Sequence, residues 1–433
     1  MSVSVAPSRH LPLIALLVMI LFLVGCATNP VTGERRLSLF GMSESEEIEI
    51  GREHYKPTIQ TQGGLYYLDP ELTEYVAEVS QKLAEVSDRP DLPYEFVIIN
   101  SSIPNAWALP GGKIAINRGL LLEMETEGQL AAVMGHEIVH AAASHGAQRM
   151  QRGQLINLGL AGLSIGLLAT DNRYAGLLVG GAAIGSQIAL AQYSQSHELE
   201  SDEYGIRYMA KAGYDPSEGA ELQRVFLRLS EGQNPDFISG LFATHPPSQR
   251  RVEQNERLAE RLGREGRIGR ETYQEMTAGI REKQPAYERY REAAGKYRDE
   301  AYDEAEALVD EAIAKVPDEA KFLALRGDIH RARGDRERAL TDLDKAVELY
   351  PEMFAYRISR GLVHRDLRNW ERAEADFQAS VEVVPTGIGY LGLGDAVREQ
   401  GRRDEAREHY QRAAQAGGEI GGMAQRRLED LDR

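Results

Sequence analysis

The chain has 433 residues, of which 42% are hydrophobic and 27% charged, and its formal net charge is −17. These proportions are those of a globular protein with two or three domains. The acidic balance argues against binding to nucleic acid and against electrostatic binding to anionic lipid. Because Cys26 is the single cysteine, an internal disulfide is excluded.

The N-terminus has the layout of a secretory signal. Arg9 is its one charged side chain, and an apolar run over 11–24 follows, too short to span a bilayer. We therefore expect a signal peptide over 1–25. Residues 23–26, Leu-Val-Gly-Cys, resemble the bacterial lipobox. The resemblance implies a lipid on Cys26 that anchors the chain at the periplasmic face of the outer membrane. A cleaved signal that leaves a soluble periplasmic protein with a free thiol is the alternative.

Local signals predict a tether and then a mainly helical domain with a small sheet. Residues 26–42 contain Asn-Pro and Thr-Gly turn signals and are expected to form the tether. A strand is expected at 94–99, and a hairpin over 107–116 turns at Pro-Gly-Gly. Capping residues and apolar periodicity predict helices at about 43–55, 70–86, 126–150, 194–212, 217–231 and 248–263.

Residues 136–140 have the form His-Glu-x-x-His inside an apolar, Ala-rich run. On a helix, residues four apart share one face, so His136 and His140 can bind one ion with Glu137 beside it. Zinc suits this arrangement, and Glu137 can act as the general base and then as the acid of a metallopeptidase. His145 would be turned about 140° from His140 on a continuous helix, so we do not expect it to be a ligand.

A third ligand is expected on a separate helix. The metzincin pattern is excluded because Ala143 and Gly146 stand where that family needs Gly and His. Glu198 and Asp202 are four residues apart on one helical face, so we assign Glu198 as the third ligand. Asp202 can then accept a hydrogen bond from a ligating histidine and fix its tautomer. Glu200 as the ligand stays open, because spacing alone does not show which face points inward.

Together these motifs resemble the HtpX and CAAX prenyl protease superfamily of zinc metallopeptidases. The segments that carry the resemblance are 136–140, 198–202, Asn105 to Gly112 and Thr244 to Pro247. Ser201 departs from the family, which often has Ala there. Arg251 matches a family Arg that orients a carboxylate.

His245 is an ambiguous residue in the last of these segments. Pro246 and Pro247 stiffen the backbone that follows it. His245 could stabilise an oxyanion, bind zinc in place of water and hold the enzyme latent, or belong to a loop that only caps a helix. In the family interpretation, a strand within 107–117 would pair with an extended substrate. A purely structural hairpin is the alternative.

Two further regions follow the His-Glu-x-x-His motif in the chain. Residues 154–193 are rich in Gly, Ala and Leu, and we expect a tightly packed helical hairpin, with contact to membrane or an apolar substrate as the alternative. Markers then recur with a 34-residue step, namely Pro317, Pro351 and Pro385, Ala305, Ala339 and Ala373, and Gly327 and Gly361. This period predicts about four tetratricopeptide repeats over 286–420.

The sequence thus predicts a gluzincin-type metallopeptidase domain over 43–264, a connector over 265–285 and an α-solenoid of repeats. One zinc ion per chain is expected. With the repeats, the resemblance implies cleavage of unfolded or misfolded outer-membrane proteins, with the repeats binding the substrate or the barrel-assembly machinery. A lipid-anchored chaperone or scaffold with a latent or structural zinc site is the alternative.

Overall fold

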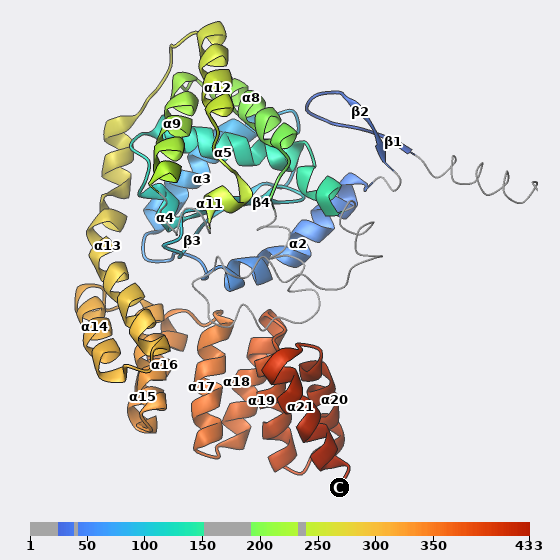
Figure 1. The fold of residues 1–433 in the computed structure, drawn as a ribbon, viewed down its shortest axis with the longest axis vertical. Helices are drawn as coiled ribbons and strands as arrows, with labels where there is room; N and C mark the ends of the chain where they lie inside the picture. Colours follow the sequence, from blue (N-terminus) through green and yellow to red (C-terminus); the bar gives the residue numbers. More distant parts are fainter. Residues whose placement is uncertain (1–24, 39–41, 151–191, 233–239) are drawn as a thin grey trace, which may run out of the picture.

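The computed structural model describes residues 25–38, 42–150, 192–232 and 240–433. The expected signal peptide, apart from Gly25, and the apolar segment 154–193, apart from its last two residues, lie outside these ranges. Among the helices that are described, none is both long and apolar enough to cross a membrane. The peptidase domain and the repeats are two bodies stacked along the long axis of the molecule (Figure 1).

The expected tether contains a small β-hairpin. β1 (Gly25–Thr28) pairs antiparallel with β2 (Arg35–Ser38), and the turn between them contacts the peptidase domain. Part of the segment expected to be a tether, 26–42, is therefore a pair of strands. The Asn-Pro and Thr-Gly signals mark a single turn between these two strands.

The helices of the peptidase domain lie close to the predicted ranges. Their bounds are α2 (Glu44–Thr61), α3 (Pro70–Glu85), α4 (Arg118–Leu121), α5 (Glu127–Ala142), α8 (Gln195–Lys211), α9 (Ser217–Glu231), α11 (Leu241–Thr244) and α12 (Gln249–Leu262). Ser43 and Glu46 form the expected capping box, and Thr126 caps α5. Local capping chemistry therefore sets where these helices begin.

A three-stranded sheet lies beside α5, with the strand order β3-β5-β4. β4 (Ala106–Leu109) and β5 (Lys113–Asn117) form the predicted hairpin, and Gly111 and Gly112 supply the positive φ angles of its turn. β3 (Glu95–Ile99) pairs parallel with the far side of β5. β4 is therefore an edge strand of this sheet.

The helix that carries the His-Glu-x-x-His motif is shorter than predicted. α5 ends at Ala142, Ser144 has a φ of 57°, and a new helical turn begins at His145. A left-handed residue at this point redirects the chain, so His145 does not continue the face pattern of α5. The prediction of one continuous helix to Met150 is wrong here.

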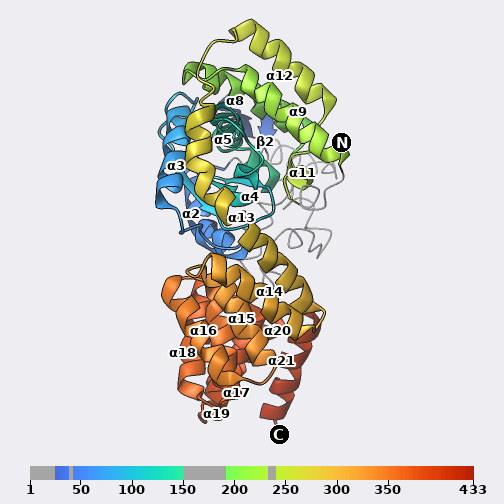
Figure 2. The ribbon, with the colours of Figure 1, turned by 90° about the vertical axis from the view of Figure 1, so that its left-hand side faces the viewer.

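The expected connector is mostly helical. α13 (Arg270–Arg298) runs without interruption from the peptidase domain into the first repeat (Figure 2). The Tyr273 hydroxyl, near its start, donates to the carbonyl of Leu121 at 2.7 Å. Near its middle, the Arg118 guanidinium lies 3.5 Å from the centre of the Tyr287 ring. A continuous helix with contacts to the peptidase domain is a rigid spacer rather than a flexible linker.

The repeats form the helical solenoid that the 34-residue period predicts. Its helices are α14 (Tyr302–Lys315), α15 (Ala320–Ala332), α16 (Arg336–Leu349), α17 (Phe354–Asp366), α18 (Trp370–Val383), α19 (Gly387–Glu399), α20 (Arg403–Ala414) and α21 (Gly418–Leu431). The periodic alanines Ala305, Ala339 and Ala373 are fully buried. They occur where neighbouring helices need a small side chain at their contact.

The repeats dock on the peptidase domain through polar contacts. The Tyr350 hydroxyl accepts from the Leu65 amide and from Gln60 Nε2, both at 3.0 Å. Lys321 Nζ donates to the carbonyl of Asn100 at 2.6 Å. The Glu319 carboxylate accepts from the Asn100 side chain at 2.8 Å. These bonds fix the repeats against the loops beside β3.

Candidate metal centre

The crossing of α5 and α8 depends on two glycines. A Cβ placed on Gly135 would lie 3.1 Å from the Gly205 carbonyl oxygen, and one placed on Gly205 would lie 2.9 Å from the His136 amide nitrogen. Any side chain at either position would push the helices apart. This close approach brings Glu198 and Asp202, on the inner face of α8, to the two histidines of α5.

Four side chains converge with the spacing of a metal site. His136, His140, Glu198 and His245 each contribute one donor atom, and these atoms lie within 4.8 Å of one another. His136 Nε2 is 3.0 Å from His140 Nε2 and 3.3 Å from His245 Nδ1. The Glu198 carboxylate oxygens are 3.0 to 3.6 Å from the three histidines. Ligands at 2.0–2.1 Å from a tetrahedral zinc would be separated by about 3.3 Å, so these residues fit zinc.

Glu137 lies beside this cluster and is 1% exposed. Its Oε2 has no hydrogen-bond partner among the described residues, and its Oε1 is 3.5 Å from His245 Nε2. Burial raises the pKa of Glu137 above its ordinary value. A carboxylate with a raised pKa and a free oxygen is suited to taking up and returning a proton.

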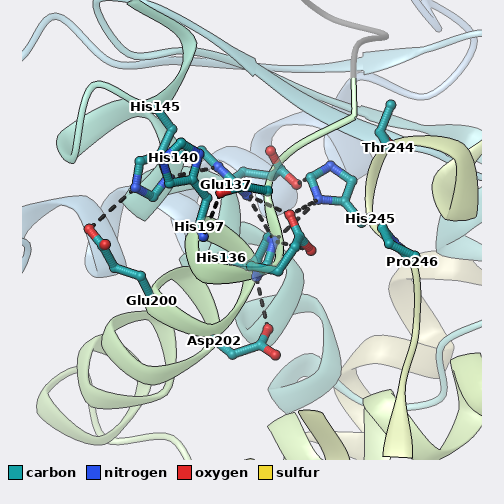
Figure 3. Close-up of polar contacts among 12 residues, drawn as sticks. His136, Glu137, His140, His145, His197, Glu200, Asp202, Thr244, His245 and Pro246 are labelled. Carbon is teal, nitrogen blue, oxygen red and sulfur yellow. Dashed lines mark hydrogen bonds and ion pairs between the residues drawn. The ribbon is translucent and has the colours of Figure 1, made fainter. Parts of the chain in front are cut away.

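Asp202 supports His136, as predicted from its position on the helix. Its Oδ1 accepts from His136 Nδ1 at 2.9 Å (Figure 3). Arg251 donates to both of its carboxylate oxygens at 2.7 Å. Burial raises the pKa of Asp202, but the Arg251 guanidinium outweighs burial and holds it below the usual value. An ionised Asp202 fixes the His136 tautomer with Nε2 directed at the cluster.

Of the other three donors, Glu198 and His140 are held in the forms that bind metal. Burial raises the pKa of Glu198, but electrostatic attraction to His245, Arg251 and His136 outweighs burial and holds the pKa well below the usual value. Burial lowers the pKa of His140 well below its ordinary value. Ionised carboxylate and neutral imidazole are the ligand forms of these residues.

His145 and Glu200 also reach the site, although neither joins the four donors. His145 Nδ1 is 3.0 Å from His140 Nδ1, and its Nε2 is 3.2 Å from Glu200 Oε1. On a continuous helix, His145 would point away from His140. The break at Ser144 instead brings the His145 ring into contact with the His140 ring. Glu200 is turned about 200° from Glu198 on an ideal helix, and its carboxylate contacts His145 (Figure 3).

Tyr193 was not predicted to be a site residue. Its ring stacks on His140 with centroids 3.7 Å apart. It comes directly before α8 in the chain, and no motif in the sequence marks it.

A cleft opens beside Glu137 and is mostly apolar. It encloses about 460 Å³, including solvent at its mouth. Its walls come from α5, α8, α9, α11 and α12, and its apolar lining includes Val133, Ile206, Leu222, Phe226 and Leu241. An apolar cavity next to a proton-transfer group is a binding place for part of a substrate.

Comparisons with known proteins agree with this geometry. Peptidase family M48 matches residues 70–259, and the tetratricopeptide repeat family matches 288–354 and 358–419. The chain is 26% identical to the beta-barrel assembly-enhancing protease of Yersinia pestis, over 71% of this chain and 67% of that protein. It is 27% identical to the protein of the same name from Escherichia coli strain K12, over 71% of this chain and 69% of that protein. It is 30% identical to the mitochondrial metalloendopeptidase OMA1 of Schizosaccharomyces pombe, over 56% of this chain and 68% of that protein.

The predicted fold class, a mainly helical metallopeptidase domain followed by repeats, is confirmed by these matches and by the structure. The chain belongs to peptidase family M48 and is a metalloendopeptidase whose peptidase domain is followed by tetratricopeptide repeats.

Proposed function

We propose that this protein is a zinc-dependent endopeptidase that cleaves misfolded or stalled outer-membrane proteins. The observation that carries the proposal is the tetrahedral spacing of His136, His140 and Glu198 beside the buried carboxylate of Glu137. The class of substrate rests on relatives named beta-barrel assembly-enhancing proteases.

His136, His140 and Glu198 hold the zinc ion in this proposal. Zinc, when bound, lowers the pKa of a water molecule and polarises a peptide carbonyl. Glu137 accepts the proton of the attacking water on its free Oε2 and delivers it to the leaving amine. Asp202 and Arg251 keep His136 in one tautomer and orientation while this happens.

The apolar cleft and the sheet would bind the peptide on either side of the scissile bond. The cleft beside Glu137 takes one apolar side chain of the substrate. β4 is an edge strand, and an extended segment can add to such an edge by main-chain hydrogen bonds. Recognition through the backbone selects unfolded chains over folded ones.

The repeats and the N-terminus would locate the enzyme. Tetratricopeptide solenoids present concave surfaces for protein partners, so we assign to the repeats the binding of the substrate or the barrel-assembly machinery. Acylation of Cys26 would hold the chain at the periplasmic face of the outer membrane. The lipobox at 23–26 supports this location.

A second candidate function is favoured by the position of His245. Its Nδ1 lies 3.3 Å from His136 Nε2 and 3.0 Å from Glu198 Oε1, where a fourth ligand would be. A histidine there takes the place that a catalytic site leaves open for water. The site would then be latent, and the protein would work as a lipid-anchored chaperone or scaffold until His245 is displaced.

The test uses the chain without residues 1–25 and with Cys26→Ala, loaded with zinc. Cleavage of an unfolded β-barrel protein is measured for this protein and for its Glu137→Gln and His245→Ala variants. We expect Glu137→Gln to retain zinc and lose about 10²–10⁴-fold in rate, because proton transfer contributes that much. If the site is latent, His245→Ala cleaves faster than the parent protein.

Two outcomes separate the candidates. The peptidase proposal is wrong if the zinc-loaded parent protein and its His245→Ala variant both cleave no faster than Glu137→Gln. Equal cleavage by the parent and by His245→Ala would overturn latency while leaving the peptidase.

A further inference from the structure

The two histidines of α5 are supported in different ways. His136 contacts a carboxylate directly, through Asp202. His140 contacts a second histidine, His145, at 3.0 Å, and that ring contacts the Glu200 carboxylate at 3.2 Å. Glu200 Oε1 in turn accepts a hydrogen bond of 2.5 Å from Asn29 Nδ2, in the turn between β1 and β2. A chain of three contacts therefore joins His140 to the N-terminal hairpin.

The hydrogen positions along this chain are consistent with metal binding. His140 points Nε2 at the other donors, so its neutral ring carries hydrogen on Nδ1 and donates to His145 Nδ1. His145 then carries its hydrogen on Nε2 and donates to Glu200. Each of these ring nitrogens then either donates or accepts. The Glu200 carboxylate accepts from both His145 and Asn29. Such partners set the tautomer and orientation of a ligating histidine.

Asn29 is held in place by its own turn. Its Oδ1 accepts from the amides of Val31 at 2.9 Å and Thr32 at 3.2 Å, and its carbonyl accepts from Gly33 at 2.9 Å. Asn29 is 3% exposed, and Val31 is 8% exposed within the main core of the peptidase domain. With Oδ1 occupied, the Asn29 amide group has a fixed direction, and this direction leads to Glu200 on α8.

We propose that the turn from Asn29 to Gly33 positions a ligand of the metal centre. Asn29 is a positioning residue that holds Glu200, and through Glu200 and His145 it fixes the ring of His140. Because Asn29 lies three residues after Cys26, the chain of contacts links the proposed membrane anchor to the metal centre. The inference rests on the proposed function, since it assumes that His140 binds the metal.

The test measures metal affinity in the mature full-length protein, by competition with a zinc chelator and without substrate. We expect Asn29→Ala to weaken zinc binding, by no more than the roughly 10–100-fold that losing a direct outer partner of a zinc ligand costs, because Asn29 acts through Glu200 and His145. With cobalt in place of zinc, the visible absorption bands of Asn29→Ala should shift, because the His140 ring takes a different orientation.

Two variants of the same turn serve as controls. Val31→Ala removes core packing from the turn but keeps the Asn29 amide, and Thr32→Ala removes a half-buried hydroxyl that accepts from the Glu34 amide at 3.2 Å. Both should keep the zinc affinity and the cobalt spectrum of the parent protein. In a Glu200→Ala background, which removes the acceptor of both contacts, Asn29→Ala should add little, because both changes break the same chain of contacts.

The outcomes are distinguishable. If Val31→Ala weakens zinc binding as much as Asn29→Ala, the turn acts through packing and the inference is wrong. The inference also fails if Asn29→Ala binds zinc within twofold of the parent. A parent protein that binds no zinc would instead overturn the proposed function.

Discussion

The repeats and the metal centre use the same pairing of arginine with a buried carboxylate, but they build it differently. In the repeats, Arg326 binds Asp342 and Arg360 binds Asp376, each across sixteen residues at 2.7 to 2.9 Å. In the metal centre, Arg251 binds Asp202, 49 residues earlier, at 2.7 Å. The first pairing recurs with the period of the sequence, whereas the second joins elements far apart in the chain.

Burial separates the two kinds of pair further. The side chains of Arg326 and Arg360 are 25% and 20% exposed, whereas that of Arg251 is 4% exposed. Arg251 also lies 2.9 Å from Glu198, so it neutralises two buried carboxylates. The repeat pairs therefore stabilise a local helix contact, while the pair in the metal centre keeps a charged cluster together.

The largest expected effect comes from the metal ligands themselves. Glu198→Gln removes a charged donor from the cluster, whereas Glu200→Gln alters only the support of His140. After dialysis against a chelator, Glu198→Gln should retain far less zinc than Glu200→Gln, as measured by metal analysis. The opposite order would move the third ligand to Glu200.

A smaller difference is expected between the two kinds of arginine. Arg251→Ala leaves Asp202 and Glu198 buried without their cation, which costs about 3–5 kcal/mol of unfolding free energy. Arg360→Ala should cost about 1–2 kcal/mol, because its pair is partly solvated and Asp376 keeps Arg357 at 3.7 Å. Thermal unfolding and zinc content check this, and Arg360→Ala should keep its zinc. Equal losses in both variants would mean that burial does not distinguish the pairs.

The smallest effect is expected where the two bodies meet. Tyr350→Phe removes the hydroxyl that accepts from the Leu65 amide and Gln60, at a cost of about 0.5–1.5 kcal/mol, because both partners are uncharged. Calorimetry should show the transitions of the two bodies moving apart, with zinc binding unchanged. Tyr302→Phe, in α14 and outside this contact, is the matched control. If both variants unfold like the parent, the interface does not couple the two bodies.

Much of the fold could be predicted because its signals are local. The capping box at Ser43, the turn at Gly111 and Gly112, and the 34-residue period each depend on neighbours in the chain. The helical form of the connector does not follow from local signals. Its polar composition indicates only a connector, and contacts of Tyr273 and Tyr287 with the peptidase domain hold it as the helix α13.

Some residues of the candidate site could be predicted from local spacing, and others could not. Helical spacing predicted that His136 and His140 share a face and that Glu198 and Asp202 share another. It could not predict His145, because the positive φ of Ser144 interrupts the helix and no spacing rule contains that break. It could not place Asn29 beside Glu200 either, since 171 residues separate them.

By itself, the sequence determined the metal-binding motif, the order of the two bodies and the solenoid, because these follow from periods and caps within a few turns of chain. The tertiary structure alone decided which residues surround the metal-binding motif. The approach of Gly135 to Gly205, the place of His245 as a fourth donor and the contact of the N-terminal turn with α8 all depend on how distant elements pack. Packing of this kind is a property of the whole core, and no short stretch of sequence contains it.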